Sequence, residues 1–261
     1  MTDNTQALVQ TRIEDRIAIV TMVDPKRRNP FSLAVRAGLL EAFSSLYRDP
    51  GCAAIVLTGA GGHFCSGGDI SEMGAVGVIE GRNRMVATTD LARLIVTGQK
   101  PVIAAVEGFA IGAGVSLTAA ADFAVASREA RFGCAFIKVG LLPDTGALWT
   151  VPRKVGPGKA MELFGLGEQF DAAEAHRIGL VNRLAEPGGA LEAAVEVARK
   201  YAALPLASFA VLKGVLSKAS ASLEDALHAE TALQPMLKYT DDHREAVAAF
   251  MEKRPPRFTG R

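Results

Sequence analysis

Residues 103–122 read IAAVEGFAIGAGVSLTAAAD, and this stretch decides the fold. An apolar run leads to a turn at Gly108, then to Ala113 between two glycines, and finally to a helix of small residues. Upstream, residues 64–70 read FCSGGDI and predict a second turn. Because glycine has no Cβ, both turns let backbone N–H groups come close to a ligand. Either turn alone fits tight packing of a strand against a helix, but together they can direct two amides at one oxygen atom.

Four segments follow one another along the chain: FCSGGDISEM, VEGFAIGAG, GLLPDTG and DAAEAHRIGLVNRL. In this order they resemble the crotonase, or enoyl-CoA hydratase/isomerase, superfamily, and the resemblance covers nearly the whole chain. It implies an α/β fold with a spiral core of ββα units over residues 1–200 and a helical trimerisation region over residues 201–261. It also implies self-association to a trimer or hexamer. The implied substrate is an acyl thioester of coenzyme A, with no separate cofactor.

In that family two peptide N–H groups hold the thioester carbonyl and stabilise the enolate that forms from it. By position, the resemblance assigns these two donors to Gly68 and Ala113. Donors fixed at ~2.7–3.1 Å from a developing oxyanion are effective, and losing one typically costs ~3 kcal/mol of barrier. The sequence predicts that a helix begins at Ala113, so unsatisfied amides and the helix dipole add to the attraction for negative charge.

The proton-transfer residues differ from those of hydratases in the family, which carry two glutamates. The corresponding positions hold Ser116 and Phe136, so ordinary hydratase activity is in doubt. One carboxylate remains in this neighbourhood, Asp144 in the Pro-Asp-Thr-Gly segment. Local sequence favours a helix N-cap for Asp144. Resemblance to enoyl-CoA isomerases, including those of the ring 1,2-epoxyphenylacetyl-CoA type, instead implies that Asp144 is the single proton shuttle of a Δ3,Δ2-enoyl-CoA or ring-type isomerase. We expect Phe136 and Trp149 to help exclude water.

The resemblance also indicates where coenzyme A and the acyl group bind. The loop over residues 25–30 contributes a basic candidate, and the two glycine turns contribute further contacts. Residues 249–254 match a segment that reaches coenzyme A in the family, sometimes from a neighbouring subunit. The implied binding residues are Arg28, Ser66, Asp69, Ile70, Gly114, Phe136, Trp149, Phe250 and Lys253.

Two other functions remain open at this point. In the dehalogenase branch of the same fold, an Asp at the position of Asp144 attacks an aromatic ring. That branch also uses an upstream histidine, where this chain has Thr89 and Asp90. A non-catalytic acyl-CoA-binding protein is the third interpretation, and activity on a 3-enoyl-CoA distinguishes it from an isomerase.

Composition narrows the function classes further. The 261 residues are 49% hydrophobic and have a mean hydropathy of +0.19, which favours an oligomer that buries extra surface. Net charge is +1, from 29 basic and 28 acidic residues, which argues against a nucleic-acid partner. We expect no membrane span and no metal site. Three cysteines without a CxxC pair indicate small buried side chains in a reducing, cytoplasmic setting: Cys52, Cys65 and Cys134.

Hydrophobic periodicity predicts alternating strands and helices, followed by a helical C-terminal third. A hairpin is expected over residues 7–23, and Ser32 is expected to cap the helix after it. Residues 71–84 are predicted to form a mobile loop before a helix near residues 91–95. Further strands are expected at 53–57, 102–106 and 123–126, and helices at 160–166, 172–177, 191–201, 209–216, 223–233 and 243–253.

Overall fold

A computed structural model describes residues 7–74, 76–218 and 222–260. The chain begins with the expected hairpin, β1 (Val9–Glu14) and β2 (Ile17–Met22), which pair antiparallel. After the short 3-10 helix η1 (Pro25–Arg27), helix α1 (Leu33–Arg48) follows. Its N-cap is Ser32, as predicted: the Ser32 hydroxyl accepts the N–H of Val35 at 3.2 Å.

The main sheet has the order β1-β2-β3-β4-β6-β9 in the described residues. Only β1 runs antiparallel to its neighbour, and the remaining pairs are parallel. The other strands are β3 (Ala54–Gly59), β4 (Val102–Val106), β6 (Phe123–Ser127) and β9 (Arg183–Ala185). The first three of these were predicted, whereas β9 was not.

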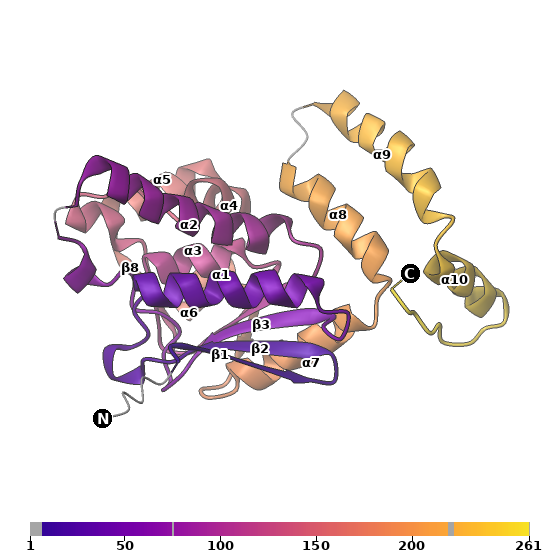
Figure 1. Ribbon diagram of the computed structural model, residues 1–261, viewed down its shortest axis with the longest axis horizontal. Coiled ribbons are helices and arrows are strands. Elements are labelled where there is room, and N and C mark those ends of the chain that lie inside the picture. The colour runs from indigo at the N-terminus through magenta and orange to yellow at the C-terminus, as the bar shows by residue number, and fades with distance from the viewer. Residues whose placement is uncertain (1–6, 75, 219–221, 261) are drawn as a thin grey trace.

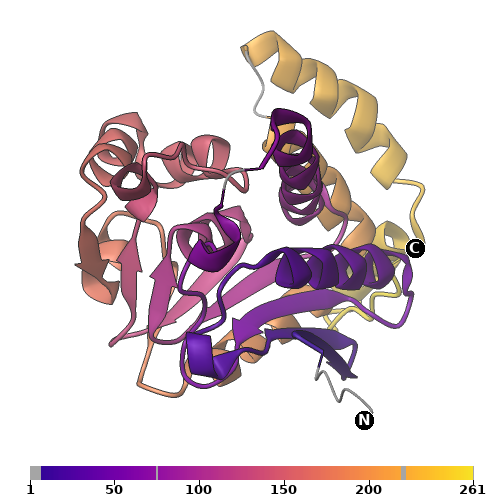
Figure 2. The same cartoon turned by 60° about the vertical axis from the view of Figure 1, so that its left-hand side comes forward.

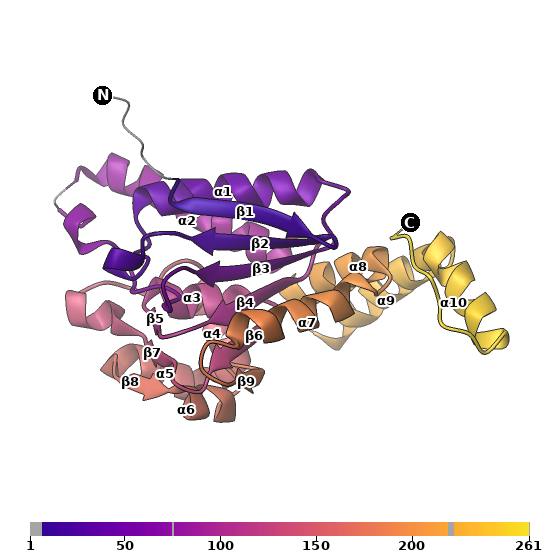
Figure 3. The same cartoon turned by 90° about the horizontal axis from the view of Figure 1, so that it is seen from below.

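Helices cover both faces of this sheet (Figures 2 and 3). Successive strand residues alternate between the faces, as in any strand. Val20 and Leu57 belong to the core that includes α1, α2 (Val78–Thr97) and α3 (Ala113–Ala120). Ile19 and Val56 face the opposite way and pack with α7 (Ala190–Ala202). Burial on both faces explains the continuous apolar runs of the parallel strands.

A second, three-stranded sheet has the order β5-β7-β8 in the described chain. Its strands are short, and the sequence pattern predicted none of them: β5 (Phe109–Ile111), β7 (Arg131–Gly133) and β8 (Gln169–Asp171). Between and after them come η3 (Ala135–Val139), α4 (Ala147–Val155), α5 (Pro157–Leu166) and α6 (Ala172–Arg177). The small sheet positions the turn that leads into α3.

The last helices, α8 (Leu206–Lys218), α9 (Leu223–Leu237) and α10 (Asp241–Met251), extend past one end of the sheet (Figure 1). They leave large apolar side chains exposed, among them Leu216 and Leu223. Assembly through these helices stays a prediction. No helix in the described ranges is long and apolar enough to cross a membrane.

The prediction of a mobile loop over residues 71–84 is wrong for most of that segment. Ile70–Glu72 forms the 3-10 helix η2, and α2 already begins at Val78, while residue 75 lies outside the described residues. Packing against α1 stabilises α2, and an ion pair between Glu80 and Arg84 joins successive turns of the helix. These contacts outweigh the glycines that made the segment look irregular.

Candidate active site

The two glycine turns are held side by side by one parallel bridge between Cys65 and Ala110. The Cys65 N–H donates to the carbonyl of Phe109 at 2.8 Å, and the Ile111 N–H donates to the carbonyl of Cys65 at 2.9 Å. Cys65 and Ala110 are both fully buried. The pairing therefore fixes the register of the first turn against β5.

Gly68 and Ala113 each lie three residues beyond that bridge. Gly67 and Gly112 just before them have φ values of +102° and +52°, which non-glycine residues rarely adopt. A Cβ built on Gly112 would lie 3.8 Å from the Cα of Gly67, so the two turns pass close to each other. Within residues 7–74, 76–218 and 222–260, no protein acceptor takes the N–H of Gly68 or Ala113.

Ala113 is also the first residue of α3, as predicted. The N-cap, Gly112, has no side chain to satisfy the amides of the first turn, and α3 is buried along its whole length. Unsatisfied amides at a helix N-terminus favour an anion, and the helix dipole adds to this. The local geometry therefore suits negative charge on a ligand oxygen.

A cavity of about 510 Å³ opens beside these turns. The turns, α1, α2, η3 and the segment before α4 surround it, and its volume lies in the range typical of small-molecule sites. Its apolar wall includes Met73, Met85, Ile111, Phe136 and Leu141. Gly68, Ala113, Phe136 and Asp144 therefore share one cavity, although sequence analysis took them from three separate motifs.

Asp144 is the predicted proton-transfer residue, and it lines this cavity. It is half-buried, and its Oδ1 accepts the hydroxyl of Thr145 at 3.0 Å. Burial raises the pKa of Asp144 above its usual value, while the Thr145 hydrogen bond and the positive charge of Arg36 act in the opposite direction. A carboxylate made more basic by desolvation is suited to proton abstraction.

The alternative that Asp144 caps a helix is wrong. The N-cap of α4 is Gly146, and no side chain caps this helix. Asp144 contributes only its main-chain carbonyl, which accepts the N–H of Ala147 at 3.0 Å. The carboxylate is therefore free of a structural role at the helix end.

Neither hydratase glutamate position supplies an acid. Ser116 is fully buried within α3, and its hydroxyl donates to the carbonyl of Gly112 at 3.3 Å. Phe136 is 9% exposed, and its ring lies 3.8 Å from the Cβ position of Gly112. Phe136 thus covers the turn at Gly112 with an apolar surface.

A family model described as enoyl-CoA hydratase/isomerase matches residues 12–261. The chain belongs to the enoyl-CoA hydratase/isomerase family. The 1,2-epoxyphenylacetyl-CoA isomerase of Escherichia coli (strain K12) is 33% identical over 258 residues, covering 97% of this chain and 98% of that protein. The short-chain-enoyl-CoA hydratase of Clostridium acetobutylicum is 34% identical over 247 residues, covering 92% and 93%.

The crystal structure of an enoyl-CoA hydratase from Mycobacterium smegmatis has a TM-score of 0.90 to this chain at 32% identity, covering 96% of this chain and 98% of that one. The predicted crotonase-type α/β fold is therefore confirmed. Relatives in this enoyl-CoA hydratase/isomerase family carry both isomerase and hydratase names, so membership establishes an acyl-CoA enzyme rather than one reaction.

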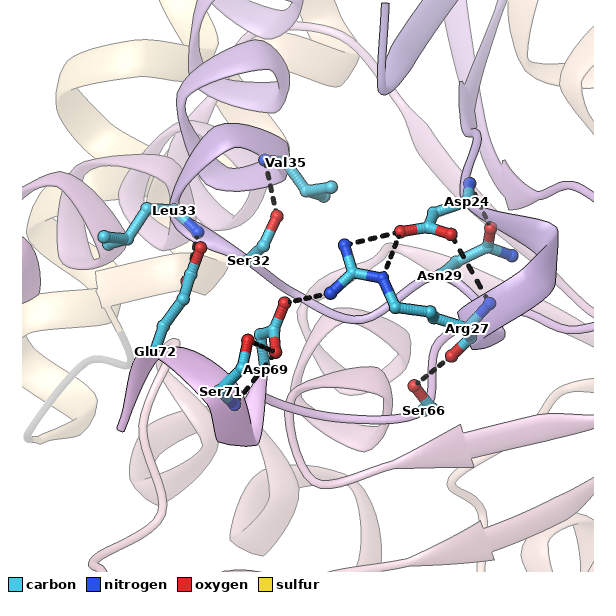
Figure 4. A network of polar contacts seen from close by, with 10 residues as sticks. All are labelled: Asp24, Arg27, Asn29, Ser32, Leu33, Val35, Ser66, Asp69, Ser71 and Glu72. Atoms are coloured by element: carbon cyan, nitrogen blue, oxygen red, sulfur yellow. Dashed lines mark hydrogen bonds and ion pairs between the residues drawn. The ribbon is translucent and has the colours of Figure 1, made fainter. Parts of the chain in front are cut away.

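The rim of this family member's cavity carries three of the predicted binding residues, Ser66, Asp69 and Ile70. Asp69 accepts hydrogen bonds from the Ser71 hydroxyl and from Arg27, both at 2.6 Å (Figure 4). These bonds lower the pKa of Asp69, the Ser71 hydroxyl having the largest effect. The Ser66 hydroxyl donates to the carbonyl of Arg27 at 3.1 Å. The network fixes the first glycine turn against the loop at residues 25–30.

Arg28 does not reach the cavity in the described chain. Its guanidinium lies 5.0 Å from the ring centroid of Phe109, and its carbonyl accepts the N–H of Ser66 at 3.0 Å. The neighbouring Arg27 makes the ion pairs instead, to Asp24 and Asp69. Sequence position alone did not reveal which of the two arginines points toward the turn.

Three more of the predicted binding residues lie away from the cavity, among the residues described. Gly114 packs on the first turn, since a Cβ there would lie 2.8 Å from the carbonyl oxygen of Cys65. Phe250 is 82% exposed on α10, and Lys253 follows that helix. Contact of Phe250 and Lys253 with coenzyme A bound to a neighbouring subunit stays a prediction.

Trp149 does not line this cavity, so the prediction that it shields the site is wrong. It is 40% exposed and lines a second cavity, between α4 and α8. Trp149 is the third residue of α4, whereas Asp144 precedes that helix and lines the first cavity. Phe136 alone of the predicted pair covers the site.

Three charged residues of the cavity were not among the predicted site residues: Arg36, Glu72 and Arg84. The Arg36 guanidinium donates to the carbonyl of Phe31 at 3.1 Å and to the hydroxyl of Thr88 at 3.3 Å. Glu72 accepts the N–H of Leu33 at 2.8 Å (Figure 4). Asp144 is therefore not the only carboxylate near the predicted chemistry. The sequence contains one signal for Arg36: it lies three residues after Leu33, so both side chains are on one face of α1.

Proposed function

We propose that this family member is an enoyl-CoA isomerase that moves the double bond of a 3-enoyl-CoA to position 2. The observation that carries the proposal is Asp144, a desolvated carboxylate in the same cavity as the unpaired amides of Gly68 and Ala113. A 1,3-proton shift needs one base that takes a proton and returns it. The two hydratase glutamates, by contrast, are replaced by Ser116 and Phe136.

In the proposed reaction the thioester oxygen accepts hydrogen bonds from Gly68 and Ala113. Asp144 removes a proton from the α-carbon, and the negative charge spreads to the oxygen as a dienolate. The two amides are fixed by the Cys65–Ala110 bridge, so little reorganisation accompanies the appearance of charge. Protonated Asp144 then delivers its proton to the γ-carbon. The shift thus leaves the enzyme unchanged and needs no water.

Coenzyme A is placed on the rim formed by Ser66, Asp69 and Ile70 in this proposal, with Arg28 available for phosphate. The acyl group enters the apolar part of the cavity beside Phe136. Self-association to a trimer or hexamer belongs to the same proposal, because the exposed apolar side chains of α9 and α10 need a covering surface. Phe250 and Lys253 then reach a neighbouring subunit's substrate.

A side-by-side assay with 3-hexenoyl-CoA and crotonyl-CoA tests the reaction. We expect conversion of 3-hexenoyl-CoA to the conjugated 2-enoyl-CoA, with slow or no hydration of crotonyl-CoA. Fast hydration with no isomerisation refutes the proposal. Binding of both thioesters with no turnover of either identifies the chain as a non-catalytic acyl-CoA-binding protein.

Hydration of an enoyl-CoA is the second candidate, because Glu72 gives the cavity a second carboxylate besides Asp144 that does not pair with an arginine of the described chain, as Asp69 does, and because several relatives are named hydratases. Glu72, however, already accepts the N–H of Leu33 at 2.8 Å. Dehalogenation is less well supported. At the position of its histidine, Thr89 donates to the carbonyl of Val86 and Asp90 pairs with Arg93, both on the exposed side of α2.

A further inference from the structure

A second cavity, of about 420 Å³, lies between α3, α4 and α8, away from the candidate active site. Helix α8 packs against α2 beside it (Figure 1). The wall is mostly aliphatic and aromatic, formed by Val96, Ala119, Ala120, Trp149, Tyr201, Leu204, Phe209, Leu212 and Leu216. A cavity of this size and lining suits the apolar part of a small ligand.

Positively charged residues outnumber negatively charged ones in the lining of this cavity. Lys154, Lys213 and Arg153 face one carboxylate, Asp122. Asp122 is already committed, since its Oδ2 accepts a hydrogen bond from the Lys213 ammonium at 2.6 Å. Lys213 also donates to the carbonyl of Lys100 at 3.0 Å. Lys154 and Arg153 have no carboxylate of the described chain within 4 Å, but Arg153 is exposed and its guanidinium lies over the Trp149 ring.

Lys154 is the more informative of the two. Its ammonium donates to the carbonyl of Ala121 at 3.0 Å, and no second acceptor is found for it in the ranges that the structure describes. Although the residue as a whole is half-buried, desolvation of its ammonium lowers the pKa of Lys154 to about 8. A buried cation that keeps two unused N–H donors is costly unless an anion joins it.

We propose that the second cavity binds a free fatty acid, with the carboxylate on Lys154 and the alkyl chain against Phe209, Leu212 and Leu216. A carboxylate supplies the missing acceptor through charge-assisted hydrogen bonds. The aliphatic wall favours an alkyl chain over a small hydrated anion such as phosphate. The assignment is independent of the proposed isomerase reaction, since it uses none of the residues of the first cavity.

Trp149 makes this site directly observable, because it is the only tryptophan of the chain and lines the second cavity. Decanoate is the probe, titrated into the full-length protein while Trp149 fluorescence and calorimetric heat are recorded. We expect a saturable fluorescence change and one decanoate per chain. 1-Decanol, which has a similar chain and no charge, should bind about tenfold more weakly or worse, as loss of a charged hydrogen bond predicts.

Variants separate this site from the first cavity. Lys154→Met should weaken decanoate binding about tenfold or more, and Ser217→Glu, at the cavity wall, should weaken it through like-charge repulsion. Lys200→Met, which removes an exposed lysine of α7, is the matched control and should bind normally. Saturating crotonyl-CoA should leave decanoate binding unchanged.

Three outcomes overturn the proposal. The first is the absence of a saturable Trp149 response to decanoate. The second is normal binding by a folded Lys154→Met protein, or, if that variant does not fold, by Ser217→Glu. The third is displacement of decanoate by crotonyl-CoA, which would place the fatty acid in the first cavity.

Discussion

Replacing Asp144 with asparagine tests the proposed proton shuttle with little disturbance of the structure. The side-chain oxygen of the new amide can still accept the Thr145 hydroxyl, which lies 3.0 Å from Asp144 Oδ1. The main-chain bond from Ala147 is unaffected, and α4 has no side-chain cap to lose. No capping penalty, typically ~1 kcal/mol, is therefore expected.

The effect on stability also has a predictable sign. The folded-state pKa of Asp144 is raised, so folding disfavours its ionised form. This cost grows as the pH rises from the ordinary pKa of an aspartate through the raised pKa, and it is fully present above that value. The uncharged amide in Asp144→Asn carries no such cost at neutral pH. The melting temperature should therefore stay the same or rise slightly, and binding of the thioester should change little.

Catalysis should respond differently. Loss of a positioned general base typically lowers kcat by ~10²- to 10⁴-fold, which corresponds to about 2.7–5.4 kcal/mol of barrier. Steady-state kinetics with 3-hexenoyl-CoA, together with calorimetric binding of an unreactive thioester, measures both effects. Glu72→Gln is the matched control, because glutamine still accepts the Leu33 N–H, and it should keep most of its activity. Normal kcat in Asp144→Asn, or a loss found only in Glu72→Gln, refutes the reasoning.

Three further predictions concern the surroundings of Asp144. Gly68→Pro removes a donor N–H and should lower kcat by ~10²- to 10³-fold, whereas Ala113→Gly keeps its N–H and should stay active; an active proline variant shows that Gly68 is not a donor. Gly114→Ala places a Cβ 2.8 Å from the carbonyl oxygen of Cys65, so the free energy of unfolding should fall by ~1–3 kcal/mol and kcat should also fall. Thermal denaturation and steady-state kinetics measure the two effects, and unchanged values would mean that the two turns can move apart without cost. Arg36→Met removes a positive charge that lowers the pKa of Asp144, so the acid limb of the kcat/KM profile should move to higher pH, and an unmoved limb assigns that limb to another group.

Much of the fold follows from local sequence. The hairpin β1–β2, the Ser32 cap of α1 and the start of α3 at Ala113 depend on alternation, on a capping hydroxyl and on a glycine turn. Each signal lies within a few residues of the feature it specifies. The strands β5, β7 and β8 were missed because three residues are too few to show a period, and their pairing depends on distant partners.

The same distinction between local sequence signals and long-range packing applies to the candidate site. The motifs gave Gly68, Ala113, Phe136 and Asp144, which the fold brings to one cavity. They did not give Arg36, because its place in the cavity depends on how α1 packs against α2. Trp149 was misassigned for the same reason. It lies only five residues after Asp144, but it belongs to helix α4 and lines the second cavity instead of the first.

The bridge between Cys65 and Ala110 has a consequence for how this enzyme can change over evolution. In the proposed mechanism the two donors are main-chain N–H groups, and each lies three residues after its bridged residue, Cys65 or Ala110. Side chains near the donors can vary while that spacing holds. A single inserted or deleted residue in either turn would instead carry one amide out of reach of the shared oxygen. Chain length between bridge and donor, more than residue identity, is therefore what selection must preserve here.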